Sequence, residues 1–249
     1  MKALHFAKPS EYRLEITTDP LVQGGVLEGR LEMTNRGGAA QEARALEVAL
    51  GFAVFKTLKS EGRTAMRILE RQTLLQGQSV APGATIRADF SFALGLNFPP
   101  HSKTCGPFVL YGGNVEDPED CGQMDLPVVV SPPLASFIEI FENHHAFLAG
   151  ETRHNGNLLE VRFKPPSSHP TLVELLVQLD IGEEETQLEF RMRGKSVQGG
   201  ASGGVASRKK EHGERVPTRE LLPPGGMPNR GLYREIWQRM VDALVPPRM

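Results

Sequence analysis

The sequence predicts a mainly β chain built from stacked antiparallel sheets. Three runs between Leu158 and Arg193 alternate apolar and charged residues with a period of two, and turn-rich polar segments separate them. Such alternation places apolar side chains on one face of a sheet and charged ones on the other. Similar runs lie between Tyr12 and Val130, and the 26 glycines and 19 prolines favour many turns over long helices. Short strands at this spacing are typical of β-sandwiches.

The first half of the chain supplies most of these strands. The segment 43–55 has two possible interpretations. Its Ala and Glu residues favour a helix, and its alternating apolar residues favour a strand, which is the interpretation we adopt. We expect strands at Tyr12–Thr17, Val26–Thr34, Ala43–Phe55, Thr64–Gln76, Thr85–Leu94, Phe108–Tyr111 and Leu126–Val130.

Prolines 132 and 133 mark a predicted boundary between two domains, residues 1–131 and 132–249, because proline cannot continue a strand ladder. Apolar residues at helical spacing then predict a short helix over Leu134–Leu148. The segment 194–207 holds five glycines and no aromatic residue. It has little to bury, so we expect a mobile loop there.

An amphipathic helix is predicted over residues 229–245, with Asn229 as its cap. A helix this short is marginal in water, so its apolar face needs a surface: its own domain, a sister subunit in a homo-oligomer, or a membrane. Acidic residues offset the positive charge of its polar face, which favours packing over peripheral membrane contact. The candidate partner-binding residues on the apolar face are Leu232, Ile236, Trp237, Met240, Val241 and Leu244.

Composition excludes several classes of function. The net charge is −2 and the pI is about 6.4, so no global field recruits nucleic acid. A local basic cluster follows the glycine-rich segment; it can contact phosphate groups or serve as a solvated linker, and it comprises Arg208, Lys209, Lys210, Arg215 and Arg219. Residues 1–10 lack the apolar core of a signal peptide, and no window approaches the ~18 apolar residues of a membrane span. We therefore expect a cytoplasmic protein with two unpaired thiols, Cys105 and Cys121.

No motif predicts catalysis, a cofactor or a metal. The Gly-x-Ser-x-Gly run at 200–204 lies in a glycine-rich stretch with one later histidine, His212. The acidic residues between 116 and 120 lack the spacing of a calcium loop, which favours a solvated turn. The remaining candidates for a metal site lack the close spacing of zinc ligands; they are His144, His145 and His154, or His101 with Cys105.

Two pieces of the sequence resemble the bacterial sporulation-control protein family. The first is the turn and strand at Leu21–Leu31, followed by the turn Val80–Gly83 and the phenylalanine-containing strand around Phe90–Phe92. The second is Asn157–Lys195, with a strand that ends in aromatic-x-Pro and a later strand of the pattern Glu-x-x-x-Arg, at Glu189–Arg193.

The resemblance implies two tandem arrestin-like, or immunoglobulin-like, β-sandwich domains without enzymatic activity. It also implies an intracellular adaptor or scaffold that binds other proteins and acts in the control of development and stress responses. Edge strands of a sandwich can accept a partner strand by backbone pairing. The alternative is a ligand-binding module for carbohydrate or lipid, although the chain has few amphipathic aromatic rings to stack on sugars: three tyrosines and one tryptophan.

Overall fold

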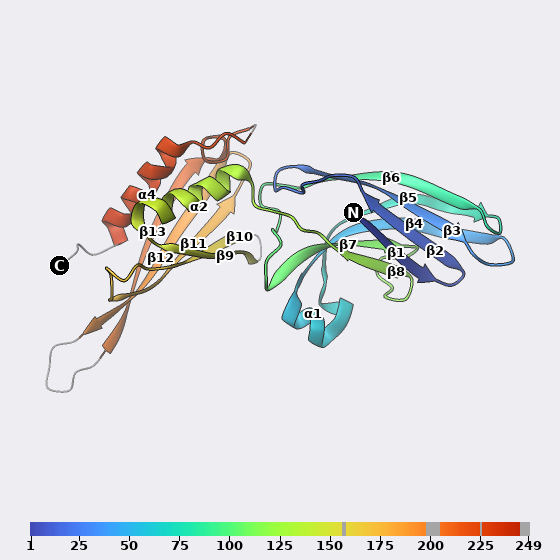
Figure 1. The fold of residues 1–249 in the computed structure, drawn as a ribbon, viewed down its shortest axis with the longest axis horizontal. Coiled ribbons are helices and arrows are strands. Elements are labelled where there is room, and N and C mark those ends of the chain that lie inside the picture. The colour runs from blue at the N-terminus through green and yellow to red at the C-terminus, as the bar shows by residue number, and fades with distance from the viewer. Residues whose placement is uncertain (156–157, 198–204, 225, 245–249) are drawn as a thin grey trace. The chain divides into compact units, whose positions relative to one another are not determined.

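A computed structural model describes residues 1–155, 158–197, 205–224 and 226–244 of the chain (Figure 1). The chain divides into two compact units, Met1–Val129 and Val130–Met249. Every strand in both units pairs antiparallel with its sheet neighbours. The prediction of a mainly β chain with antiparallel sheets and few short helices is therefore confirmed.

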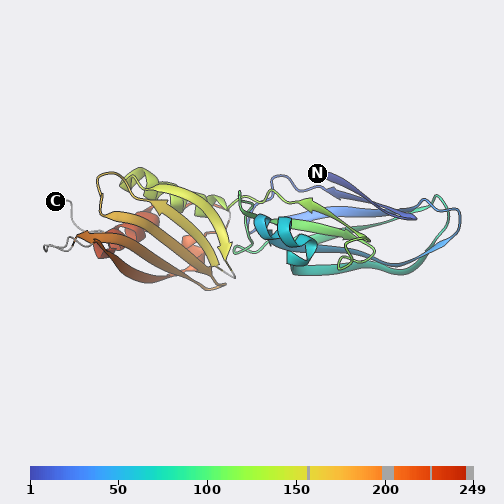
Figure 2. The same cartoon turned by 90° about the horizontal axis from the view of Figure 1, so that it is seen from below.

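Unit 1 contains two four-stranded sheets (Figures 1 and 2). The first sheet has the order β1 (Lys2–Ala7), β2 (Ser10–Ile16), β3 (Val26–Asn35) and β6 (Thr85–Ala93). The second has the order β5 (Arg67–Val80), β4 (Gln41–Val54), β7 (Cys105–Gly112) and β8 (Cys121–Asp125). The core joins both sheets, with Leu14 and Leu31 from the first and Leu46 and Val109 from the second. Each of these side chains is fully buried, as the alternation of their strands predicts.

Three details of unit 1 differ from the sequence-based expectation. Strand β1 was not predicted. A helix that was not predicted, α1 (Phe55–Glu61), follows β4, and a 3-10 turn, η1 (Gly62–Ala65), occupies the first two residues of the strand expected at residues 64–76. The expected strand at 126–130 is reduced to a bridge between Val22 and Val129, because Pro127 has no amide hydrogen to donate to a ladder. The strand expected over 43–55 is confirmed as β4.

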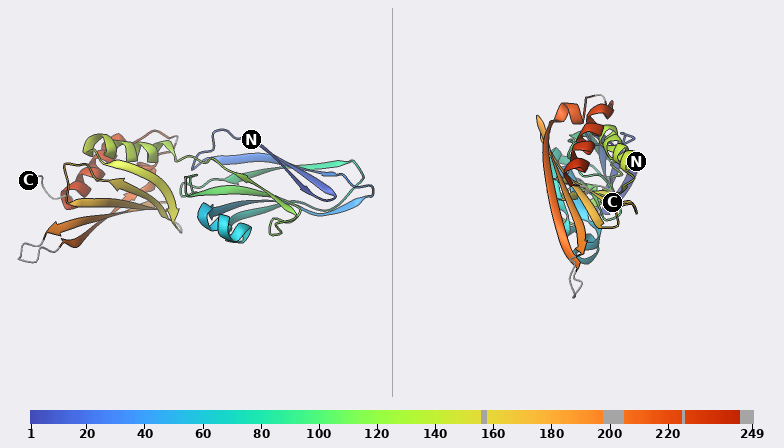
Figure 3. Two further views of the ribbon diagram at one scale, coloured as in Figure 1. Left: turned by 60° about the horizontal axis from the view of Figure 1, so that its bottom comes forward. Right: turned by 90° about the vertical axis from the view of Figure 1, so that its left-hand side faces the viewer.

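Unit 2 is built on one five-stranded sheet. Its order is β13 (Val205–Pro217), β12 (Glu185–Val197), β11 (Leu172–Ile181), β10 (Leu158–Lys164) and β9 (Leu148–Asn155). Helices α2 (Pro132–His145) and α4 (Arg230–Leu244) lie on one face of this sheet, as Figure 3 shows, and α3 (Thr218–Leu221) follows β13.

The second β-sandwich expected from the resemblance is thus corrected in the described part of unit 2. Helices take the place of a second sheet. The reason is a change of period: outside the sheet, the long apolar segments of this unit repeat at 3.6 rather than 2 residues, so they bury their apolar stripes as helices. The predicted helix at 134–148 is confirmed as α2.

The glycine-rich segment also differs from expectation at both ends. Strands β12 and β13 pair along their length, from Glu185 with Pro217 to Val197 with Val205. The central part of the expected loop, residues 198–204, lies outside the described residues. Strand pairing uses backbone groups and needs no apolar side chain. The charged residues of β13 therefore give no alternating apolar pattern that would predict a strand. None of the described helices is long and apolar enough to cross a membrane.

Candidate functional site

The predicted partner-binding face of the C-terminal helix packs on its own unit. Asn229 Oδ1 accepts a hydrogen bond from the Leu232 amide at 3.3 Å, which is the predicted cap. Of the six predicted residues, the structure buries Ile236, Trp237, Met240 and Leu244 and leaves Leu232 and Val241 half-buried. The helix therefore finds the surface it needs within unit 2. Partner binding by this face stays a prediction, and in the described fold it would require α4 to leave the sheet.

Trp237 is the centre of that packing. Its indole Nε1 donates a hydrogen bond to the Phe137 carbonyl oxygen at 2.7 Å, and its ring stacks on Phe141 with the centroids 3.9 Å apart. From the sheet, Phe163 and Phe190 meet the indole edge-on, at centroid distances of 5.6 and 5.5 Å. Full burial of a large apolar side chain contributes about 1.5–3 kcal/mol, and a favourable aromatic pair adds about 0.5–1.5 kcal/mol. Trp237 is therefore a core residue of unit 2.

Strand β13 meets α4 with charged side chains. Lys210 Nζ donates a hydrogen bond to the Leu244 carbonyl oxygen at 3.3 Å. Arg239 donates two hydrogen bonds to the Glu214 carboxylate, at 3.1 and 2.7 Å, and His212 Nε2 lies 3.0 Å from Glu214 Oε1. Burial raises the pKa of Glu214, but its hydrogen bonds with Arg239 and His212 outweigh burial, so the pKa lies below its ordinary 4.5. These contacts fix one side of the helix to the sheet edge.

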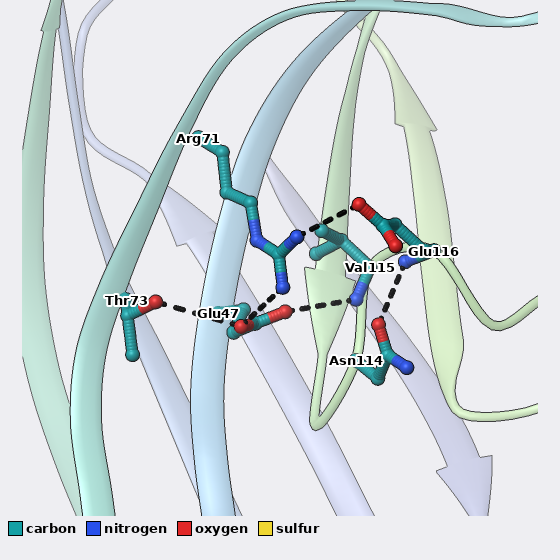
Figure 4. A network of polar contacts seen from close by, with 6 residues as sticks. All are labelled: Glu47, Arg71, Thr73, Asn114, Val115 and Glu116. Carbon is teal, nitrogen blue, oxygen red and sulfur yellow. Dashed lines mark hydrogen bonds and ion pairs between the residues drawn. The ribbon is translucent and has the colours of Figure 1, made fainter.

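A second polar network ties the loop after β7 to strand β4 in unit 1 (Figure 4). The Arg71 guanidinium donates to Glu47 Oε1 at 2.6 Å and to Glu116 Oε1 at 2.9 Å. The Val115 amide donates to Glu47 Oε2 at 3.1 Å, and Asn114 Oδ1 accepts from the Glu116 amide at 3.0 Å. The hydrogen bond to Glu47 raises the pKa of Arg71. Both oxygens of the buried Glu47 carboxylate are used, so the network fixes a loop and leaves no free base.

The acidic turn between β7 and β8 is also engaged by its own unit. Tyr12 donates a hydrogen bond from its hydroxyl to Asp120 Oδ1 at 3.3 Å, and Asp117 Oδ1 accepts one from the Glu119 amide at 2.9 Å. Burial raises the pKa of Asp120 and raises that of Tyr12 to about 12. Within the described ranges, no group of three or more His, Cys, Asp or Glu side chains is placed to hold a metal ion.

The structure places two of the histidine candidates for a metal site, His145 and His101, on aromatic rings and leaves His144 exposed. The His145 ring packs on Phe141 at 5.2 Å, and burial lowers the pKa of this histidine. The His101 ring packs on Phe55 at 5.6 Å. Both cysteines are buried and unpaired, as predicted.

Strand β1 presents a surface that the sequence reading missed. It is an edge strand of its sheet: it pairs with β2 on one side, and no strand in the described part of the chain forms a backbone ladder with its other side. Strand β8 of the second sheet lies alongside that side without pairing, and His5 Nε2 is 3.2 Å from the Glu119 carbonyl oxygen, so an added strand has to separate β1 from β8. Leu4 and Phe6 lie on one face of β1, and they are 49% and 61% exposed. The alternation of residues 2–7 signals a strand, but its apolar side faces solvent rather than the core.

The sheet face that carries these two residues is otherwise mainly polar or charged, although Val26 at the start of β3 is 46% exposed there. One row of cross-strand neighbours runs Lys2, Glu15, Arg30, Asp89, so that the sign alternates at each strand. Lys2 pairs with Glu15 at 2.9 Å and Arg30 with Asp89 at 2.7 Å. The hydrogen bond from Lys2 lowers the pKa of Glu15. An apolar pair at the open edge of such a face is not needed for solubility or packing, which marks it as the candidate interaction site.

Comparison with solved structures identifies a protein of the same fold. No protein-family model and no curated protein matches the sequence. The crystal structure of Spo0M, a sporulation control protein from Bacillus subtilis, matches with a TM-score of 0.68 at 17% identity, covering 94% of this chain and 98% of that one. A β-glucosidase from Listeria innocua matches at a TM-score of 0.29 and 14% identity, over 48% of this chain and 16% of the enzyme, too weakly to carry an argument. The chain therefore has the fold of Spo0M, and the resemblance to the sporulation-control fold is confirmed.

Proposed function

We propose that this protein is a non-catalytic intracellular adaptor that binds an extended segment of a partner protein along strand β1. The observation that carries the proposal is the unpaired backbone edge of β1, with Leu4 and Phe6 exposed on the outward face of the strand. A peptide added to an edge strand gains backbone hydrogen bonds, and pockets or patches for its alternate side chains give specificity. Every second side chain of such a peptide would lie beside Leu4 and Phe6.

Three of the other edge strands, β6, β13 and β9, are less suited to this role. The outward face of β6 carries polar and charged residues, among them Arg87 and Asp89. Strand β13 carries charges on both faces, including Lys209 outward and Glu214 inward, and inward charges at an edge discourage strand addition. Strand β9 pairs with β10 through an irregular register. Apolar residues at successive outward positions of an edge strand favour β1.

The chain has the fold of Spo0M, whose name assigns that protein to sporulation control. We accordingly propose that the partner of this chain belongs to a pathway that controls development or stress responses. The polar groups of both units engage one another rather than a reacting site: Glu47 with Arg71, and Glu214 with Arg239. These pairings support a structural use of the ionisable groups.

A peptide selection tests the proposal. Random peptides displayed on phage would be selected against the whole protein, and the enriched peptides titrated against wild type and against Leu4→Lys and Phe6→Glu. We expect enriched peptides with alternating apolar residues, whose affinity falls about tenfold or more in each variant because a charge replaces an apolar contact. Lys209→Gln on β13 is the control and keeps wild-type affinity. Peptides that bind all the variants equally would contradict binding at β1.

A further inference from the structure

A small cationic cavity lies in unit 2 at the C-terminal end of α4. Its volume is about 200 Å³. Three basic residues border it: Lys195 from β12, and Arg208 and Lys210 from β13. Arg208 and Lys210 lie on the sheet face toward the helices, whereas Lys195 alternates to the opposite face, with Arg193. No Asp or Glu is among the described residues that line it. The two like charges of Arg208 and Lys210 at one cavity repel each other unless an anion neutralises them.

A glycine keeps the cavity open. Gly194 lies two residues beyond the buried Met192 on β12, at a position that faces the helices, and it pairs with Arg208. A Cβ atom at Gly194 would lie 3.3 Å from the Thr171 carbonyl oxygen, so a larger side chain would fill this space. The wall is otherwise apolar, formed by Leu172, Met192 and Leu244. The cavity therefore combines an apolar wall with a positively charged rim.

Lys210 is held in place by the protein. Its ammonium donates to the Leu244 carbonyl oxygen at 3.3 Å, at the end of a helix whose last turn has no basic residue of its own. A cation at this end of a helix is favoured by the helix dipole. An ammonium group has three donors, and this contact uses one of them. Two donors thus remain for a ligand.

We propose that this cavity binds the phosphate monoester group of a small ligand, with an apolar substituent against the wall. A phosphate monoester carries a charge of about −1.5 to −2 at pH 7, which suits the two cations Arg208 and Lys210 better than the single charge of a carboxylate. Lys and Arg are the usual donors to phosphate. The cavity is smaller than the roughly 300–1,000 Å³ of sites for drug-sized ligands, which favours a headgroup over a whole nucleotide. A free phosphate ester and a phosphatidic acid headgroup both present this chemistry.

Titration calorimetry of the whole protein with phenyl phosphate, in a low-salt buffer without phosphate, tests the free ligand. Flotation with phosphatidylcholine vesicles, with and without phosphatidic acid, tests the lipid source. We expect saturable binding in at least one arm. Arg208→Gln and Lys210→Gln each weaken it about tenfold, the loss expected for one charge-assisted hydrogen bond.

Lys209→Gln is the matched control, because it removes the same charge from the neighbouring residue, which pairs with Arg193 on the other face of the sheet. It should keep wild-type binding. The melting temperature of each variant is measured as well. If Lys210→Gln lowers it, the conclusion is drawn from Arg208→Gln, because Arg208 is exposed and its loss should not affect stability. Binding in either arm that is lost in Arg208→Gln and kept in Lys209→Gln supports the proposal. Absence of saturable binding in both arms, or an equal loss in Lys209→Gln and Arg208→Gln, overturns it.

Discussion

Unit 1 and unit 2 cover the apolar face of a sheet in different ways. In unit 1 a second sheet packs over the first, so every core residue comes from a strand or an adjoining loop. In unit 2 the helices α2 and α4 cover one five-stranded sheet, and Trp237 joins them to it. The apolar face of sheets with the same alternating pattern can therefore be covered either by a second sheet or by helices. The period of the segments outside the sheet decides which one forms.

The two units also differ at their edges. Strand β13 of unit 2 carries Lys210, His212 and Glu214 on the face toward α4, where they hold the helix and discourage strand addition. Strand β1 of unit 1 has an unpaired backbone edge beside Leu4 and Phe6. Inward charges protect the edge of β13, whereas β1 has β8 alongside it and carries an exposed apolar pair on its outward face. We infer from this contrast that unit 1 supplies the interaction surface.

The largest effect is expected in the helix-covered core. Phe141→Ala should lower the free energy of unfolding of unit 2 by about 3–5 kcal/mol, because the fully buried ring stacks on Trp237 and its loss leaves a cavity. Trp237 is the only tryptophan of the chain, so urea unfolding followed by its fluorescence reports on unit 2. His144→Ala on the exposed side of α2 should change the value by less than about 0.5 kcal/mol. Equal effects of the two changes would contradict this core.

A smaller effect is expected in the polar network of unit 1. Glu47→Gln should cost about 1–3 kcal/mol, because the buried site loses its charge-assisted hydrogen bond from Arg71. Calorimetry should show a lower melting temperature for unit 1, while the unfolding transition of unit 2, followed by Trp237 fluorescence, stays unchanged. Glu42→Gln on the exposed face of the same strand is the control. If Glu42→Gln lowered the free energy of unfolding as much as Glu47→Gln does, removal of a negative charge, and not the loss of the network, would explain the effect.

The dependence of stability on pH should have opposite signs at one carboxylate of each unit. The pKa of Glu214 is lowered in the fold, so its contribution is present above its ordinary 4.5 and is lost as the pH falls through the lower folded value. The pKa of Asp120 is raised by burial, so its contribution is present below 3.8 and is lost as the pH rises through the folded value.

Urea unfolding between pH 3 and 6, followed by Trp237 fluorescence, tests the pH dependence expected for Glu214. Glu214→Gln should remove about 1 kcal/mol at pH 6 and less at pH 3. Unchanged acid sensitivity in Glu214→Gln would rule out its role. Asp120→Asn should leave the fluorescence transition of unit 2 as it is.

The smallest effect on stability is expected at the open edge. Phe6→Glu should change the melting temperature of unit 1 very little, since 61% of the side chain is already exposed. The matched change in the core of the same sheet, Leu14→Glu, should unfold the unit because it buries a charge. A large loss of stability in Phe6→Glu would mean that Phe6 is a packing residue.

Much of the fold follows from local alternation in the sequence. The strands around Leu31, Val109 and Val177 have regular alternation or short apolar runs, and the structure buries all three residues. The amphipathic helix and its Asn229 cap were predicted for the same reason, since apolar spacing and cap chemistry are local. What covers which sheet is a tertiary property, and the helices of unit 2 were expected to accompany a second sheet.

The candidate site was harder to predict, for physical reasons. Leu4 and Phe6 alternate like core residues, and only the pairing of the strands shows that their face is open to solvent. The apolar residues of α4 resembled a docking surface because a sequence does not show what lies beneath a helix. Strand β13 was missed because its inward positions carry the charged residues Lys210 and Glu214, which bond to residues of α4 that are distant in the sequence.

Amide hydrogen exchange of the whole protein, with and without a peptide selected for binding, tests the central claim most directly. The account predicts that the peptide slows exchange in residues 2–7 of β1 and leaves residues 205–217 of β13 unchanged, and that Phe6→Glu removes this protection. Protection confined to β13 or to α4, with β1 exchanging as in the free protein, would contradict it.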